Sequence, residues 1–456
     1  MKKIPLLCIV ILITFLTSAQ NFWTEVAPFS IPANNIGLYY RVNQISIVDN
    51  DVVWVTGFSG PPSNAKWSRS TDGGLTWQSG NYNFANSDFG ISSIFAISDT
   101  RAYVSVHPLT SAPQNVVGVW LTVDAGATWT QQTSAVFNTA ASWPNFIHFF
   151  DQNHGLVVGD PSVSGNYEIY TTTNGGVDWV AVPIANIPAP IPSEYGYNLN
   201  FDAKNDTIWF GTNKGRIYKS TNQGLNWTVN QSPLADFEGA SGSGSFTFKD
   251  ANEGLLTDNE YHIWRTLDGG LTWNDETTTT QGVLRNYRAV NVPGTANSYF
   301  SWGRELTNNL LGCSFSTNGG LDWQDLSTVT DVVPSVAEFN SGTMGFCIGA
   351  TYSNPALKFY KLTDPLYRML KTNTFDEFKT SLKVSPNPSN GIFKISANGQ
   401  INKIEIFDIA GKKINSSEIS NLKETELDLS GYDNGIYIAK ISNAENKSTS
   451  LKLIKI

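Results

Sequence analysis

The chain has 456 residues, a formal net charge of −9 and three cysteines. About 350 residues can bury a large core without cross-links, so the fold does not depend on disulfides. The acidic balance disfavours nucleic acid and anionic lipid as partners, because both are bound chiefly by neutralising phosphate.

The first nineteen residues have the pattern of an export signal. Lys2 and Lys3 form a basic start, an apolar run leads from Ile4 to Leu16, and Thr17–Ala19 supply a small-residue cleavage site. The run is too short and wrongly flanked for a membrane span, and no later segment approaches 18 consecutive apolar residues. We therefore predict a signal peptide at 1–19 and no transmembrane segment in the exported chain.

One eight-residue phrase, Ser/Thr-x-Asp/Asn-x-Gly-x-x-Trp, then occurs six times, with 46 to 52 residues between successive tryptophans. The copies are Ser70–Trp77, Thr122–Trp129, Thr172–Trp179, Ser220–Trp227, Thr266–Trp273 and Ser316–Trp323. A fixed period of this size indicates a repeat architecture. Strands bounded by polar turns precede each phrase and one strand follows it, which predicts four strands per unit, as in one blade of a β-propeller.

The repeated phrase resembles the Asp-box, or BNR repeat, of sialidase-like β-propellers. Its Asp or Asn can accept backbone N–H bonds in the turn, its Gly supplies a positive φ, and its Trp enters the next strand. Three of the six copies carry Asn, which argues against a required charge. We therefore predict structural roles, with ligand or catalytic roles as the alternative, for the box positions Asp72, Trp77, Asp124, Trp129, Asn174, Trp179, Asn222, Trp227, Asp268, Trp273, Asn318 and Trp323.

Six boxes predict six blades, and a seventh unit over 337–362 supplies three strands without a box. We assign its missing fourth strand to residues 21–26, because Trp23 continues the tryptophan spacing. The prediction is an all-β, seven-bladed propeller over 20–365, closed by pairing of 21–26 with 357–362. Closure of this kind removes exposed strand edges.

Two further groups of residues have alternative interpretations. Cys313 and Cys347 form a disulfide in an oxidising compartment, or are two small buried hydrophobes on separate strands. His148 and His154, with Asp151 between them, have the residue types of a metal site. His154, however, occupies the repeated turn between the first and second strands, so we expect a turn role and predict no metal or other cofactor.

Composition changes near residue 371, because every tryptophan and arginine lies before this point. Residues 381–456 contain alternating apolar residues bounded by Asn-Gly and Ala-Gly turns, which predicts a small Ig-like β-sandwich after a linker at 366–380. This segment resembles the type A C-terminal sorting domain of the type IX secretion system of Bacteroidota, in its Pro-Asn-Pro opening, its Asp408–Lys412 hairpin and its lysine-bearing last strand. The resemblance implies contact with the type IX machinery, passage across the outer membrane, and release or surface attachment. The alternative is an ordinary Ig-like adhesion module.

The residues of the propeller leave two functional hypotheses open. Over residues 21–365 it resembles the photosystem II assembly-factor-like propellers, which implies a non-enzymatic scaffold that binds a protein or glycan. The alternative is a glycoside hydrolase, sialidase-like or other, with its site in the central opening. Tyr40–Asn43 is the nearest match to the sialidase Phe/Tyr-Arg-Ile-Pro phrase, and it lacks the proline.

The ligand face is predicted from the loops between strands two and three, the loops between blades, and the ends of inner strands. These loops also carry Asp236, Glu238 and Tyr261. We expect a monomer, with aromatic and charged groups that suit protein or carbohydrate contact. The candidate residues are Trp143, Asp160, Glu194, Tyr195, Asp258, Arg285, Arg288, Arg304 and Glu305.

Overall fold

The computed structural model divides the chain into two compact units, residues 1–365 and 366–456, each described here by itself. The described residues are 23–26, 40–59, 65–84, 88–109, 114–162, 165–239, 242–278, 281–326, 332–351, 354–363, 366, 382–408, 412–442 and 448–456. The predicted signal peptide, and the predicted linker apart from residue 366, lie outside them. Within the described part, no helix has the length and hydropathy needed to cross a bilayer.

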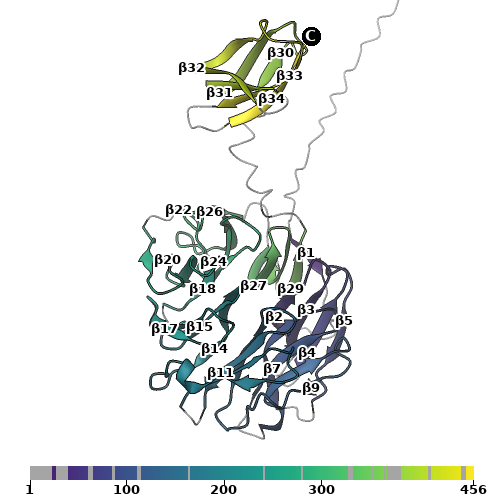
Figure 1. Ribbon diagram of the computed structural model, residues 1–456, viewed down its shortest axis with the longest axis vertical. Helices are drawn as coiled ribbons and strands as arrows, with labels where there is room; N and C mark the ends of the chain where they lie inside the picture. The colour runs from purple at the N-terminus through teal and green to yellow at the C-terminus, as the bar shows by residue number, and fades with distance from the viewer. Residues whose placement is uncertain are drawn as a thin grey trace, which may run out of the picture. The chain divides into compact units, whose positions relative to one another are not determined.

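The first unit is a seven-bladed β-propeller, whose blades form a ring around a centre near the labels β2, β14, β18 and β27 in Figure 1. Blades 1 to 3, from the centre outward, are β2 (Tyr40–Ile47), β3 (Val53–Ser59), β4 (Ala65–Ser70), β5 (Gln78–Asn81); β6 (Phe89–Ala96), β7 (Ala102–Pro108), β8 (Gly118–Thr122), β9 (Thr130–Gln131); and β10 (Pro144–Phe149), β11 (Gly155–Pro161), β12 (Tyr167–Thr172), β13 (Val180–Ala181). Two 3-10 turns accompany them, η2 (Gln114–Val116) and η3 (Ile184–Asn186).

The remaining blades repeat this antiparallel order. They are β14 (Gly196–Lys204), β15 (Thr207–Thr212), β16 (Arg216–Ser220), β17 (Thr228–Gln231); β18 (Gly244–Phe248), β19 (Gly254–Asp258), β20 (Ile263–Thr266), β21 (Asn274–Asp275); β23 (Arg288–Asn291), β24 (Tyr299–Arg304), β25 (Leu311–Ser316), β26 (Asp322–Asp325); and β27 (Val332–Ser341), β28 (Met344–Thr351), β29 (Asn354–Leu362), β1 (Trp23–Val26). Blade six departs from four strands, because β22 (Gln281–Gly282) pairs with β26 in parallel.

The seventh blade confirms the predicted closure. Strand β1 pairs antiparallel with β29, with Trp23 opposite Leu362 and Val26 opposite Phe359. Trp23 is buried, and its ring lies 6.1 Å from that of Phe339, measured between centroids. The N-terminal strand therefore supplies the outer edge of the last blade and ties the two ends of the ring together.

The apolar core lies between adjacent blades. In one example, the rings of Trp209 from blade four and Phe248 from blade five stack with centroids 3.8 Å apart. Polar side chains of the innermost strands add hydrogen bonds across the same gaps, because each accepts a backbone N–H from the inner strand of the next blade. The pairs are Ser46 with the Ala96 N–H (2.9 Å), Ser93 with the Ile147 N–H (2.8 Å), Asp202 with the Phe248 N–H (2.6 Å) and Thr247 with the Asn291 N–H (2.9 Å). Backbone donors at the edge of one inner strand are thus satisfied by the preceding blade.

The turn between the first and second strands repeats one hydrogen-bond pattern. Asp151 accepts from the backbone N–H groups of Asn153 and His154, both at 2.7 Å, and its other oxygen bonds His154 Nδ1 at 2.8 Å. Asp250 makes the same pair of backbone bonds in blade five. The predicted turn role of His154 is therefore confirmed. His148 instead belongs to β10 and contacts the Phe95 ring edge-on at 4.9 Å between centroids.

Cys313 and Cys347 are both buried free thiols. Burial raises the pKa of each thiol well above its ordinary value, which disfavours the reactive thiolate. The structure therefore matches the second interpretation of these residues, small buried side chains on β25 and β28, rather than a disulfide.

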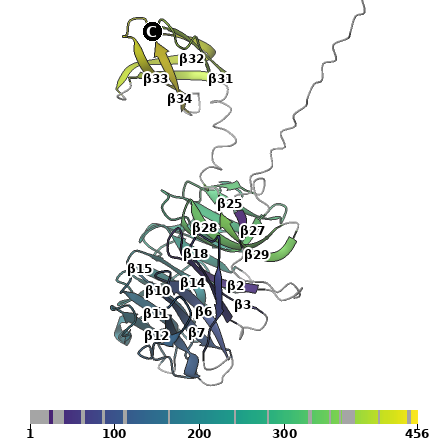
Figure 2. The ribbon, with the colours of Figure 1, turned by 90° about the vertical axis from the view of Figure 1, so that its right-hand side faces the viewer.

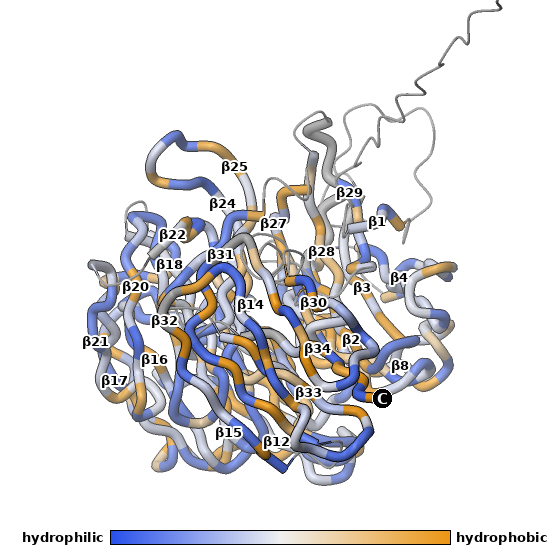
Figure 3. Tube along the Cα trace, turned by 90° about the horizontal axis from the view of Figure 1, so that it is seen from above, coloured by the Kyte–Doolittle hydropathy of each residue, from blue (hydrophilic) through white to orange (hydrophobic). Residues whose placement is uncertain are grey.

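The second unit is built on two 16-residue strands, β31 (Ile392–Phe407) and β32 (Lys413–Asp428), seen together in Figure 2. The first half of β31 pairs with β30 (Lys383–Ser385), and its second half pairs with β33 (Gly435–Ser442), which in turn pairs with β34 (Ser448–Lys455). Both halves contribute to one buried core, and hydrophilic and hydrophobic stretches both occur along the strands of this unit (Figure 3). The result is the predicted small β-sandwich.

Candidate functional site

The six box turns are held by their own side chains. In the first box, Ser70 Oγ donates to Asp72 at 2.8 Å and accepts from the Gly74 N–H at 2.7 Å. Asp72 accepts from the Thr76 N–H at 2.8 Å and from the Thr76 hydroxyl at 2.6 Å. The box carboxylate is therefore engaged by the turn it belongs to.

The boxes of Asn174 and Asn318 close the same ring of bonds, and Asn222 accepts the equivalent backbone bond from the Asn226 N–H. Asn174 accepts from the Asp178 N–H at 3.0 Å and donates its amide to the Asp178 carboxylate at 2.9 Å. Each box turn also reaches its own blade's first turn, as where the Gly175 N–H donates to Asn153 O at 2.8 Å. The boxes thus lie at the end of the ring where the inner strands finish.

Replacing Asp72 with Ala should lower the free energy of unfolding by about 1–2 kcal/mol, because turn hydrogen bonds to the carboxylate are lost. Asp72→Asn is the matched control, since the Asn boxes make equivalent bonds, and it should keep most of the stability. Urea denaturation measures both. A loss of ligand binding by Asp72→Ala, with unchanged stability, would instead assign the box a functional role.

The same carboxylate predicts a pH dependence. The Thr76 hydroxyl and N–H lower the pKa of Asp72 from 3.8 to about 2. Because the folded pKa lies below the unfolded value, this contribution is present above about pH 4 and is lost as pH falls through about 2. The stability advantage of the parent over Asp72→Asn should therefore shrink between pH 4 and pH 2, followed by denaturation at each pH. An unchanged difference would contradict it.

The inner strands enclose a cavity of about 270 Å³ in the central channel, which we call the channel cavity. Its charged and titratable lining comes from four blades: His148, Asp202, Lys204, Arg288 and Glu338. The surrounding protein raises the pKa of Glu338 to about 7 and lowers that of His148 to about 4, because it displaces the water that stabilises charge. The channel therefore holds a carboxyl group, Glu338, whose pKa is raised above its ordinary value.

A larger cavity of about 640 Å³, which we call the mouth cavity, lies where the inner strands of blades four to seven begin. It is at the opposite end of the ring from the boxes, because strands β14, β18 and β23 run from it toward the first turns. Its lining is Asn198, Asn200, Phe237, Glu238, Ser243, Gly244, Ser245, Asn259, Asn286, Tyr287, Arg288 and Ser335. Arg288 lines both cavities.

Several polar groups in the wall of the mouth cavity have unused hydrogen-bonding capacity. Asn198 Oδ1, Ser245 Oγ, Asn259 Oδ1 and Arg288 Nε are covered atoms without a hydrogen-bond partner in the protein. The Asn259 amide donates to Ser243 Oγ at 2.9 Å, and the Asn286 amide donates to Asn259 O at 3.1 Å. The loops are thus fixed by one set of bonds, while a second set of polar atoms has no partner within the protein.

Two predicted ligand-face residues are structural. Arg285 is 1% exposed, and its guanidinium donates to Asp325 at 2.6 Å and to Leu310 O at 2.8 Å. Glu305 pairs with the same guanidinium at 3.9 Å. Glu194 is also buried, and accepts from the Thr212 hydroxyl at 2.7 Å. The sequence suggested surface contacts for Arg285 and Glu194, but these side chains hold the blades internally.

The other candidates are dispersed. Asp160 accepts from the Asn145 amide and the Gly196 N–H, and burial raises its pKa to about 6. Trp143 stacks on His107 at 4.4 Å between ring centroids. Tyr195 is 43% exposed, and Arg304 donates to Asn309 O. Among the nine candidates, Arg288 lines the two cavities described above.

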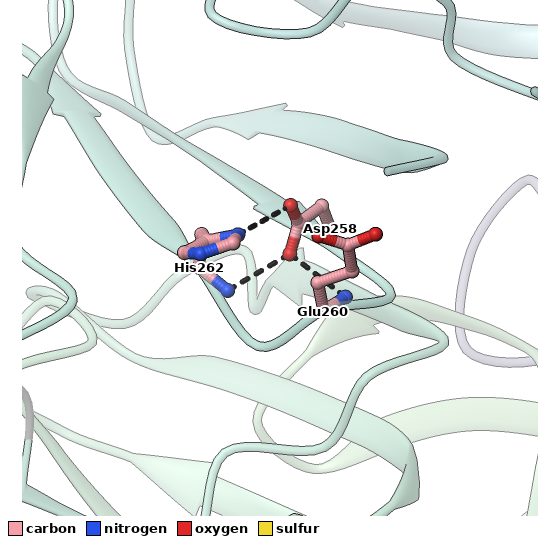
Figure 4. Close-up of side chains that lie close together, drawn as sticks. All are labelled: Asp258, Glu260 and His262. Carbon is pink, nitrogen blue, oxygen red and sulfur yellow. Dashed lines mark hydrogen bonds and ion pairs between the residues drawn. The ribbon is translucent and has the colours of Figure 1, made fainter. Parts of the chain in front are cut away.

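Asp258, Glu260 and His262 form the cluster of potential metal ligands in the described residues (Figure 4). Asp258 accepts from the backbone N–H groups of Glu260 and His262, at 3.0 and 2.8 Å, and bonds His262 Nδ1 at 2.7 Å. The hydrogen bond to Asp258 raises the pKa of His262. Neutral imidazole is the metal-binding form, so this arrangement favours a turn over an ion site.

Sequence reasoning missed most of the mouth cavity. Asn198, Asn200 and Ser245 alternate with apolar residues at the start of inner strands, where a core strand would carry apolar side chains on both faces. That alternation was the available signal. The signal becomes visible only when the strand starts are aligned across repeats, whereas Tyr195 and Arg304 stand out because they lie in loops between predicted strands.

Comparison with known proteins agrees with this division of the chain. Residues 383–456 match the family described as the secretion system C-terminal sorting domain. Photosystem II assembly lipoprotein Ycf48 of Synechococcus sp. (strain CC9902) is 26% identical over 166 residues, which are 35% of this chain and 46% of that protein. The chain thus spans about half the length of this curated relative.

Two solved structures are also similar. A structure of YCF48 bound to D1 peptide has a TM-score of 0.51 and 15% identity, with 75% of this chain and 96% of that chain covered. The GH74 xyloglucanase from Xanthomonas campestris has a TM-score of 0.43 and 12% identity, with 90% and 66% covered. At 15% identity, the likeness to YCF48 shows the fold. The chain is therefore a seven-bladed β-propeller followed by a sorting domain, which indicates export to the cell surface or beyond.

Proposed function

We propose that this protein is an exported, non-enzymatic propeller that binds a protein or glycan at the mouth cavity. The observation that supports this proposal best is the lining of that cavity, which combines amides, hydroxyls, two aromatic rings, one cation and a single carboxylate, Glu238. Hydrolysis of a glycosidic bond uses a pair of carboxyl groups. A site with many hydrogen-bonding groups and one carboxylate supports recognition rather than bond cleavage.

The similarity to a peptide-bound propeller supports the same proposal. YCF48 has this fold and was solved with D1 peptide bound. A propeller places loops from several blades around one opening, so a ligand there contacts many side chains without a catalytic group. Because fold similarity alone does not transfer function, the proposal depends on the cavity itself.

The proposal also includes the route by which the protein is exported. We propose that residues 1–19 direct the chain across the inner membrane, and that the type IX machinery recognises residues 381–456 after the 366–380 linker. The match of 383–456 to the sorting-domain family supports this assignment. The propeller, as residues 20–365, then works as a monomer outside the cell or attached to its surface.

The experiment compares the purified protein with Ser335→Trp, which places a large ring in the mouth cavity, on glycan and peptide arrays. Ser335 is exposed and lies beside a bulge of β27, so the fold should tolerate the change. We expect at least one ligand to bind the parent, to be released unchanged, and to be lost in Ser335→Trp but kept in Ser335→Ala. Turnover of a bound glycan, or equal binding by Ser335→Trp, would contradict the proposal.

Glycoside hydrolysis is the second candidate, and one observation favours it. The channel cavity contains Glu338, whose pKa is raised to about 7, together with Asp202. A protonated acid near neutrality suits general acid catalysis. Asp202, however, already accepts hydrogen bonds from the Phe248 N–H and from Lys204 Nζ. Release of reducing sugar by the parent and its loss in Glu338→Gln would establish this alternative.

A further inference from the structure

We infer that the mouth cavity binds a neutral carbohydrate of one or two sugar units, with Tyr287 as the platform for a sugar ring. This inference rests on the proposed binding function and names its ligand class. The cavity volume of about 640 Å³ lies within the usual range for small-ligand sites, about 300–1,000 Å³. A short oligosaccharide therefore fits without a long groove.

The hydrogen-bonding groups of the wall match sugar hydroxyls in kind. Asn198 Oδ1 and Asn259 Oδ1 are acceptors, Arg288 Nε is a donor, and Ser245 Oγ is both, and each lacks a partner. A sugar hydroxyl both donates and accepts, so it can satisfy either kind of group. A carboxylate or phosphate only accepts, and would leave the two amide oxygens unpaired at a cost.

The charges of the cavity also point to a neutral ligand. Among the lining residues, Glu238 and Arg288 carry opposite formal charges, so their sum is zero. Four amide side chains outnumber these two charged groups, and they come from blades four, five and six. An anion or cation would gain from one of the charged groups and be repelled by the other.

Tyr287 supplies an aromatic surface at the opening. It is 49% exposed, and its backbone N–H donates to Trp302 O at 3.0 Å, which fixes the start of β23. Gly303 lies behind it at a φ of +132°, and a Cβ on Gly303 would come within 2.8 Å of Tyr287 Cγ. Tyr287 thus packs against Gly303, and about half of the tyrosine side chain stays exposed. The apolar face of a sugar ring can therefore pack against the exposed part of the tyrosine ring.

An extended peptide is less well matched, because peptides that recognise sheets add a strand to a free edge. At the far end of the inner strands, Asp202 and Thr247 already accept the backbone N–H groups of Phe248 and Asn291 on the neighbouring strands. At the cavity, the lining residues come from separate strands and loops of four blades rather than from one continuous strand edge.

The test is isothermal titration calorimetry of the purified full-length protein. The neutral disaccharides are cellobiose, maltose, xylobiose, mannobiose and lactose. The alternative ligands are two acidic sugars, sialyllactose and digalacturonate, and a neutral Asn/Ser/Gly peptide. We expect binding of a neutral disaccharide, weakened about tenfold in Tyr287→Ala, which corresponds to about 1.4 kcal/mol. Tyr195→Ala is the matched control, because Tyr195 is similarly exposed but does not line the cavity, and it should bind as the parent does.

A second pair of variants separates binding from blade packing. Ser245 on β18 and Ser93 on β6 occupy equivalent positions, opposite Thr257 and Ser105 on their second strands. Ser93 Oγ accepts the Ile147 N–H, whereas Ser245 Oγ has no partner. Ser245→Ala should weaken sugar binding without lowering the melting temperature, and Ser93→Ala should lower the melting temperature without changing affinity.

These experiments distinguish failure of the carbohydrate inference from failure of the proposed binding function. Binding of the peptide or an acidic sugar alone, blocked by Ser335→Trp, would overturn the carbohydrate inference and leave the mouth cavity as a binding site. Absence of binding to every neutral disaccharide, or equal effects of Tyr287→Ala and Tyr195→Ala, would also overturn the inference. Hydrolysis of the sugar would overturn the proposed non-enzymatic function itself.

Discussion

Replacing Trp23 with alanine is expected to destabilise the propeller by about 3–5 kcal/mol, the usual cost of truncating a buried tryptophan. Trp23 is 2% exposed, and its ring contacts Phe300 at 6.3 Å and Phe339 at 6.1 Å between centroids. These contacts join β1 to blades six and seven. Their loss should release β1 and leave β29 as an unpaired edge.

Urea denaturation and hydrogen exchange would measure this effect. In Trp23→Ala, amides of β29 around Phe359–Leu362 should exchange faster, because β1 pairs with this stretch. Thr24→Ala is the control, since Thr24 is exposed on the same strand and should change stability by less than about 0.5 kcal/mol. Equal stability of the Trp23→Ala variant and the parent would show that the ring does not depend on its N-terminal strand.

The fold could be predicted from the sequence because its determinants are local and repeated. Each box carries its own hydrogen-bonding side chains, and the bonds of Ser70 and Asp72 recur wherever the phrase recurs. Trp23 stood at the right spacing to identify the closing strand, although it lies more than 300 residues from its partner. A repeat reveals its architecture because one unit's local rules apply to all of them.

The site was harder to predict because its residues are set by the arrangement of blades. Asn198, Ser245 and Arg288 come from three different blades and share a cavity only after the ring closes. Arg285 and Glu194 had the residue types of surface contacts, yet their ion pairs with Asp325 and Arg216 are internal. The sequence around a charged loop residue does not show whether its side chain lies at the surface or forms an internal ion pair.

Deleting residues 381–456 is expected to leave the protein in the periplasm of its host, while the propeller still folds. The match of 383–456 to a sorting-domain family motivates the first part. The second part follows from the separation of the chain into two units and from closure of the ring by β1, which uses no residue of the tail. Cell fractionation with immunodetection would locate the truncated chain, and circular dichroism with thermal melting would follow its fold.

A point variant within the tail separates loss of the signal from loss of a domain. Phe393 is fully buried in the core of the second unit, so Phe393→Ala should unfold that unit and block delivery. Lys394→Ala alters the adjacent exposed residue, whose ammonium pairs with Glu424 at the surface at 2.7 Å, and it should be delivered normally. If the secretion machinery reads the folded sandwich, delivery will follow the stability of this unit across both variants. Surface delivery of the truncated chain would instead mean that the propeller carries its own export information.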